Sequence, residues 1–142
     1  MGAPRAEIRF PATHAGFADG FARLLEFLDV QALSGAWRYN VELVFEELVA
    51  NVVKHGVRSG EEVEVHVTVE RRPDSIELCF DDNGVAFDPR TSPEPKLARS
   101  LEEARPGGFG LMLVRRAASV LDYVRTPEGR NRVTLRLRCA KS

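Results

Sequence analysis

The fold is decided by residues 37–82, which read WRYNVELVFEELVANVVKHGVRSGEEVEVHVTVERRPDSIELCFDD. In residues 37–55 the apolar side chains recur every three or four positions, which predicts an amphipathic helix, and Gly56 is a natural C-cap. The period then changes to two: apolar and polar residues alternate over 63–70 and again over 76–81. A helix followed by two paired strands is therefore the centre of the predicted fold.

Similar patterns on both sides extend this unit. The other predicted elements are a strand at 6–10, a helix at about 14–33, a long loop at 83–107, a helix at about 109–120, and strands at about 121–126 and 132–139. Because adjacent strands are joined by tight turns, the sheet should be mixed and mostly antiparallel. We expect an α+β fold, a two-layer α/β sandwich with three helices on one face of the sheet. Loops as long as the one predicted here are often functional lids.

Composition places the chain among soluble globular proteins. It has 142 residues, of which 44% are hydrophobic and 29% charged, so we expect a single domain spanning residues 1–142. A net charge of -1 argues against direct nucleic-acid binding. No apolar run is long enough for a membrane span or a signal peptide, and the two cysteines, Cys79 and Cys139, are expected to be free thiols. These features predict a cytoplasmic protein without membrane contact.

Three polar residues follow one another at intervals of four on the helix predicted at 37–55. Glu47, Asn51 and His55 would share one stripe at the border of its buried face. An amide oxygen can join the octahedral ligands of Mg²⁺, and a carboxylate one turn away can accept a proton. A solvated helix edge is the simpler interpretation of the same pattern.

A second group of polar residues ends the strand predicted at 76–81. Asp82 continues the inward parity of Phe80, so its carboxylate should face the apolar side, where the exocyclic amine of adenine could be its donor. The alternative is that Asp82 caps the turn announced by Asn83-Gly84.

Glycines open the third predicted helix. Residues 107–111 read GGFGL, and glycines at a helix start let backbone N–H groups approach a phosphate. A flexible loop-to-helix junction is the alternative for this motif alone. The order of the three motifs along the chain is far more specific than any one of them.

Three segments resemble the motifs of the GHKL, or Bergerat-type, ATP-binding fold. They are FEELVANVVKHG at 45–56, DDNGVAFDP at 81–89 and GGFGLMLVRRAASVLDYVR at 107–125. The resemblance runs from Glu7 to Leu137 and is closest to the bacterial anti-sigma-factor serine kinases. It implies that ATP and Mg²⁺ are bound, that Glu47 is the general base, and that Asn51 helps to bind Mg²⁺.

The resemblance also implies how the rest of the nucleotide is held. Asp82 would recognise adenine and Gly84 would leave room beside the base. Gly108 and Gly110 would shape a lid over the phosphates, and the residues after each of them, Phe109 and Leu111, would belong to the same nucleotide-binding segment.

Members of this branch phosphorylate a serine of an anti-anti-sigma antagonist protein, and many sequester a sigma factor as a homodimer. The resemblance therefore implies a protein serine/threonine kinase that regulates a sigma factor by partner switching. The alternative is a binding module that holds ATP structurally and acts by sequestration without phosphotransfer. A sensor histidine kinase or a gyrase-like ATPase fits 142 residues poorly.

Three positions depart from the family pattern or leave a role open. Ala86 stands where the second motif usually has glycine, and its methyl group is expected to tighten the pocket. Thr134 is the candidate for a threonine that relatives place near the nucleotide, but its parity puts it on the face opposite the apolar residues, so it is left out of the site. His55 matches the motif, and a histidine satisfied at a helix end is the simpler interpretation of it.

Overall fold

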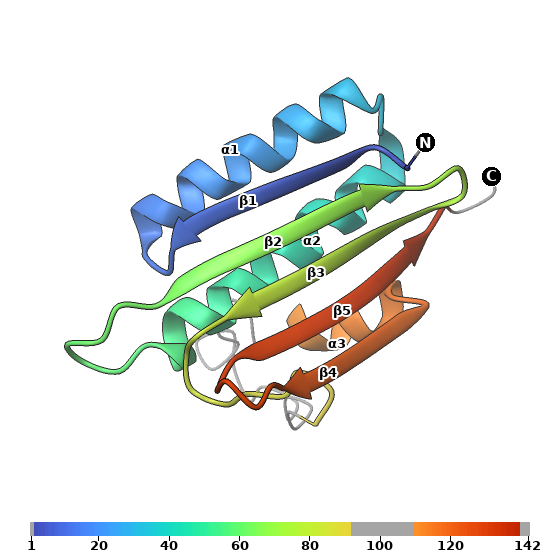
Figure 1. Ribbon diagram of the computed structural model, residues 1–142. Helices are drawn as coiled ribbons and strands as arrows, with labels where there is room; N and C mark the ends of the chain where they lie inside the picture. Colours follow the sequence, from blue (N-terminus) through green and yellow to red (C-terminus); the bar gives the residue numbers. More distant parts are fainter. Residues whose placement is uncertain (1, 92–109, 140–142) are drawn as a thin grey trace, which may run out of the picture.

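The computed structural model of the protein describes residues 2–91 and 110–139. Its elements in chain order are β1 (Arg5–Pro11), α1 (His14–Val30), α2 (Gly35–Asn51), the π-helical turn η1 (Val52–Gly56), β2 (Glu64–Arg71), β3 (Ser75–Asp82), α3 (Gly110–Ala117), β4 (Val120–Arg125) and β5 (Asn131–Arg138). The strands form one sheet in the order β1-β2-β3-β5-β4. All three α-helices cover the same face of this sheet (Figure 1).

The predicted two-layer α+β sandwich is confirmed, with one refinement. Each pair of neighbouring strands in the described sheet is antiparallel, so the sheet is not mixed. β3 and β5 are antiparallel neighbours although α3 and β4 lie between them in the sequence. None of the described helices is long and apolar enough to cross a membrane.

The core lies between the helices and the covered face of the sheet. Alternate residues of the strands point into it, namely Ile8 and Phe10 of β1, Val65, Val67 and Val69 of β2, Ile76, Leu78 and Phe80 of β3, and Val133, Leu135 and Leu137 of β5. The other face carries the polar residues of each alternation and has no helix over it in the described part of the chain (Figure 1).

Phe45 of α2 is the centre of this core. Its ring is fully buried and lies 5.8 Å from Phe10, 6.1 Å from Phe17, 6.0 Å from Phe21 and 6.0 Å from Phe80, measured between ring centroids. One aromatic side chain therefore joins α1, α2, β1 and β3, and aromatic pairs at such distances add to the free energy gained by burial. This cluster fixes α2 against β3, the two elements that carry the predicted Glu47, Asn51 and Asp82.

α2 spans Gly35–Asn51 rather than 37–55, and two other helices end earlier than the sequence-based expectation. α1 ends at Val30 rather than near residue 33, because the chain turns at Ala32, whose φ of 57° is left-handed. α3 ends at Ala117 and β4 has begun by Val120, so this helix is shorter than predicted. Both early ends arise at chain reversals, where the apolar period continues but the backbone leaves the helix.

Trp37 lies in the first turn of α2. Its indole N–H donates to the carbonyl of Leu137 at 3.3 Å, and the guanidinium of Arg71 lies 4.7 Å from its ring centroid. The indole thereby ties α2 to β5 and to the end of β2.

Candidate functional site

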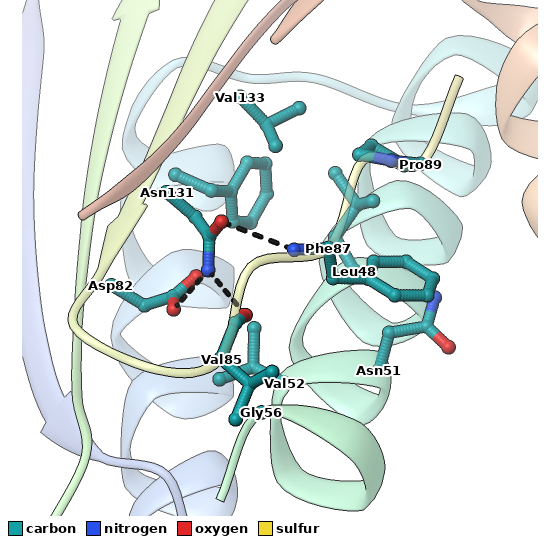
Figure 2. Close-up of a pocket in the computed structure, with 11 residues that line it drawn as sticks. Leu48, Asn51, Val52, Gly56, Asp82, Val85, Phe87, Pro89, Asn131 and Val133 are labelled. Carbon is teal, nitrogen blue, oxygen red and sulfur yellow. Dashed lines mark hydrogen bonds between the residues drawn. The ribbon is translucent and has the colours of Figure 1, made fainter. Parts of the chain in front are cut away.

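A small pocket opens between the C-terminal end of α2, the end of β3 and the start of β5. Its lining residues are Leu48, Asn51, Val52, Gly56, Phe80, Asp82, Val85, Phe87, Pro89, Asn131 and Val133 (Figure 2). Two of the residues predicted from the sequence, Asn51 and Asp82, thus lie in one pocket although they are 31 positions apart. The interior is only about 30 Å³, room for a few water molecules at most.

Asp82 lies at the inner end of the pocket and points toward the helices, as its parity predicted. It is 4% exposed. Its Oδ1 accepts a hydrogen bond from the Gly84 N–H at 2.8 Å and another from Nδ2 of Asn131 at 3.0 Å. Burial raises the pKa of Asp82, and the two donated hydrogen bonds oppose that rise. The bond to Gly84 shows that Asp82 also caps the turn, so the two interpretations of this residue are compatible.

Asn131 is the principal site residue that the sequence reasoning missed. It pairs directly with Asp82 across β3 and β5, and it is 4% exposed. Besides its bond to Asp82, its amide donates to the Val85 carbonyl at 2.8 Å and accepts from the Phe87 N–H at 3.2 Å (Figure 2). The amide oxygen also accepts from the Tyr123 hydroxyl at 2.5 Å. Its alternation with Val133 is the signal that could have revealed it, by the argument applied to Asp82.

Asn51 stands at the last position of α2 and lines the same pocket (Figure 2). Its Nδ2 is buried and has no hydrogen-bond partner within the described residues. A buried amide without partners costs free energy, and such groups in native proteins call for an explanation such as a missing ligand. An amide in this position can offer its oxygen to a cation.

The helix predicted to continue to His55 changes type after Asn51. Val52–Gly56 forms a π-helical turn, so the stripe of Glu47 and Asn51 does not continue to His55 in α-helical register. The His55 ring instead stacks on Phe87, with the centroids 5.9 Å apart and the planes at 12°. π-turns occur frequently at functional sites. Here the turn brings His55 beside the pocket wall.

Glu47 lies one turn before Asn51, half-buried and outside the pocket lining. Its carboxylate packs against the start of α3, so closely that a Cβ placed on Gly110 would overlap Oε2 and Cδ of Glu47. Burial is the main cause that raises the pKa of Glu47. Gly110 therefore leaves room for the side chain of Glu47, a contact that the sequence did not predict.

Gly84 is also used for a close backbone approach. A Cβ there would lie 2.6 Å from the carbonyl oxygen of Gly56, and the next N–H, that of Val85, donates to this oxygen at 2.9 Å. Arg125 donates to the Gly84 carbonyl at 2.9 Å. Gly84 itself does not line the pocket. Ala86 is exposed and does not line the pocket either, so the expectation that its methyl group tightens the pocket was wrong.

The remaining candidates divide into three groups. Gly108 and Phe109 lie outside the described residues, as does most of the predicted lid. Leu111 packs into the hydrophobic core and is absent from the pocket lining. Thr134 lies on the open face of the sheet, as its parity indicated, where its hydroxyl is 3.8 Å from Sγ of Cys79.

The family of the chain follows from a match over most of its length. Residues 10–137 match the histidine kinase-like ATPase domain. The chain belongs to this family. The resemblance of this chain to the GHKL proteins, inferred above from three motifs, is thereby confirmed, and ATP is the nucleotide that the family name implies.

Two curated relatives of the chain are named protein kinases. Over 115 residues the chain is 36% identical to the serine/threonine-protein kinase BtrW of Bordetella bronchiseptica, an alignment that covers 78% of this chain and 80% of BtrW. Over 79 residues it is 29% identical to the serine-protein kinase RsbW of Listeria innocua, with 53% of this chain and 50% of RsbW covered. The kinase class predicted from the motifs agrees with both.

Solved structures show the same fold at low sequence identity. The RsbU and RsbW domains of a Mycobacterium tuberculosis protein superpose with a TM-score of 0.66 at 18% identity, covering 98% of this chain and 33% of that one. The SiaB–SiaC complex of Pseudomonas aeruginosa gives a TM-score of 0.58 at 15% identity, covering 93% and 88%. The two solved structures therefore share the fold of this chain over nearly its whole length.

Proposed function

We propose that this protein is an ATP-dependent serine kinase of the anti-sigma-factor type. It would act as a single domain, residues 1–142, that binds Mg-ATP in the pocket between α2, β3 and β5. The γ-phosphoryl group would pass to a serine of an anti-anti-sigma antagonist protein, and this transfer would regulate a sigma factor by partner switching.

The pairing of Asp82 and Asn51 in one pocket carries the proposal. Asp82 is a buried carboxylate whose Oδ1 already accepts two hydrogen bonds, which leaves Oδ2 for the exocyclic amine of adenine. Asn51 offers an amide whose Nδ2 is buried and has no hydrogen-bond partner in the described chain, one helical turn from Glu47. A nucleotide site needs one group that binds the base and another near the phosphates, and Asp82 and Asn51 would fill these two roles.

Each of these side chains would have a distinct role in phosphoryl transfer. The Asn51 amide oxygen would be one ligand of Mg²⁺, which neutralises the charge of the phosphates when it is bound. Glu47 would accept the proton of the attacking serine hydroxyl. Its raised pKa makes it a better proton acceptor than an ordinary glutamate. Gly108, Phe109, Gly110 and Leu111 would contribute the phosphate-covering segment.

The comparisons support the reaction class and leave the partner to this proposal. Both curated relatives are serine kinases, and one structural neighbour, SiaB, was solved in complex with a second protein, SiaC. We propose an antagonist protein and a sigma factor as the partners, and the SiaB–SiaC complex supports a protein partner of this kind. We further propose a cytoplasmic homodimer that uses the open face of the sheet, where Glu64, His66 and Thr68 of β2 lie.

Glu47→Gln tests the kinase assignment. The substitution keeps the shape of the side chain and removes its ability to take a proton, so phosphotransfer should fall by about 100-fold or more while ATP binding persists. The assay incubates the protein with Mg-ATP and an anti-anti-sigma protein from the same organism, and phosphoserine is read by mass spectrometry. Glu26→Gln, an exposed acid on α1, is the matched control and should retain activity.

Two results would count against this assignment. Undiminished phosphotransfer by the Glu47→Gln variant would remove Glu47 as the base. Wild-type protein that binds ATP and the antagonist without forming phosphoserine would favour the binding module, in which nucleotide supports sequestration only.

A further inference from the structure

We propose that Asn131 is the residue that sets base specificity: it orients the Asp82 carboxylate so that the pocket accepts a 6-amino purine and rejects a 6-oxo purine. This inference rests on the proposed nucleotide pocket. Asn131 acts through Asp82 and is a positioning residue, since its own hydrogen-bonding groups are engaged within the protein.

The orientation of the Asn131 amide is fixed by its four partners. Its two N–H groups donate to acceptors, Oδ1 of Asp82 and the carbonyl of Val85. Its oxygen receives two donors, the backbone N–H of Phe87 and the hydroxyl of Tyr123. If the amide were rotated by 180°, its oxygen would face the two acceptor oxygens and its N–H groups would face the two donors. The side chain therefore has one stable orientation and no hydrogen-bonding group left for a ligand.

The fixed Asn131 amide determines which carboxylate oxygen of Asp82 can bind a ligand. With the Gly84 N–H, it occupies Oδ1 of Asp82, and within residues 2–91 and 110–139 Oδ2 accepts no hydrogen bond. A carboxylate oxygen only accepts, so it pairs with the amino group at position 6 of adenine and repels the carbonyl that hypoxanthine or guanine has there. A site built to bond one polar group discriminates strongly against an analogue that lacks it.

The same amide also holds the loop after β3. Val85 and Phe87 both line the pocket, and their backbone groups bond to opposite ends of the Asn131 side chain (Figure 2). Tyr123 of β4 supplies the fourth contact, so Asn131 connects β3, β5, β4 and the pocket wall. Without the Asn131 amide, the Asp82 carboxylate and the loop that forms the pocket wall both lose hydrogen bonds.

The test compares binding of ADP and inosine diphosphate (IDP), which differ in the group at position 6. Isothermal titration of the wild-type chain should give about a tenfold or larger preference for ADP, which a single hydrogen bond to a charged group supplies. Asn131→Ala should bring the two dissociation constants to within about threefold of each other. A merely structural role would weaken both nucleotides equally and leave their ratio unchanged, which overturns the inference.

Two further variants complete the design. Arg132→Ala changes the neighbouring residue, which is exposed on the other face, and should leave the ratio at the wild-type value. If Asn131→Ala does not fold, as judged by circular dichroism, Tyr123→Phe removes one of the four contacts without emptying the core and should reduce the ratio partially. An unchanged ratio in a folded Tyr123→Phe protein would then overturn the inference.

Failure of the inference is distinguishable from failure of the proposed function. A wild-type protein that binds neither ADP nor ATP contradicts the nucleotide pocket itself. A wild-type protein that binds ADP and IDP equally well retains the pocket but contradicts selection through Asp82 and Asn131.

Discussion

Two charged residues of opposite sign, Glu46 and Lys54, influence the pKa of Glu47. Burial is the largest cause that raises its pKa, Glu46 raises it further, and Lys54 lowers it. If Glu47 is the general base, it works in its ionised form, so phosphotransfer is lost as the pH falls through its pKa. The pH at which activity falls on the acidic side of the pH profile should therefore depend on the charges of Glu46 and Lys54.

Substituting these neighbours gives a prediction with opposite signs. Lys54→Gln removes the positive charge, raises the pKa of Glu47 and should move the acidic limb of kcat/KM to higher pH. Glu46→Gln removes a negative charge and should move it to lower pH. The measurement is the pH profile of phosphotransfer for the three proteins. Shifts in the same direction, or no shift in either variant, would argue against Glu47 as the titrating base.

Single-residue reasoning from the sequence succeeded where a strand parity was read and failed where it was not. The alternation of β3 predicted that Asp82 faces inward, and the structure agrees. The alternation in β5 excluded Thr134 from the site, and the structure places Thr134 on the open face. The same alternation was not followed back to Asn131, which pairs with Asp82. Spacing could not reveal the contact between Glu47 and Gly110, because it depends on how α3 packs against α2.

The end of η1 and the loop after β3 touch through backbone atoms alone. The Val85 N–H bonds to the Gly56 carbonyl, and Gly84 has no room for a side chain against the same oxygen. Gly84→Ala should break this bond and tilt Asp82, costing about 1 kcal/mol of stability and roughly tenfold in ATP affinity.

Chemical denaturation and nucleotide titration measure the two effects of Gly84→Ala. Ala86→Gly, which removes a methyl group from an exposed position of the same loop, is the control and should leave ATP affinity near the wild-type value. A Gly84→Ala protein with wild-type affinity would mean that the loop and η1 can separate without disturbing the pocket.

The hydrophobic period of the sequence predicted which segments are helices and which are strands, but it did not predict where each element ends. The helix periods of α1 and α2 and the strand alternations of β2, β3 and β5 all appear in the structure. The π-helical turn at Val52–Gly56 ends where the Gly56 carbonyl accepts the hydrogen bond from the Val85 N–H, a tertiary contact that no local pattern encodes. The left-handed Ala32 is a similar case.

At the scale of the whole molecule, the aromatic cluster around Phe45 holds both layers together. Phe45→Ala should lower the free energy of unfolding by about 3–5 kcal/mol, a large share of the total for a domain of this size. Tyr39→Ala, on the same helix but 65% exposed, should change it by no more than about 0.5 kcal/mol. Urea denaturation of the two variants checks this. Equal losses would mean that the cluster does not dominate the core.

Trp37 is the chain's single tryptophan, and its position has a practical consequence. It lies at the opposite end of α2 from Asn51, 14 residues or about 20 Å along the helix axis. Its indole contacts β5 and the end of β2. The fluorescence of Trp37 should therefore change when the protein unfolds and stay constant when a ligand is titrated into the pocket. In a single cuvette, damage to the scaffold can be separated from damage to the pocket, which is the distinction every variant above requires.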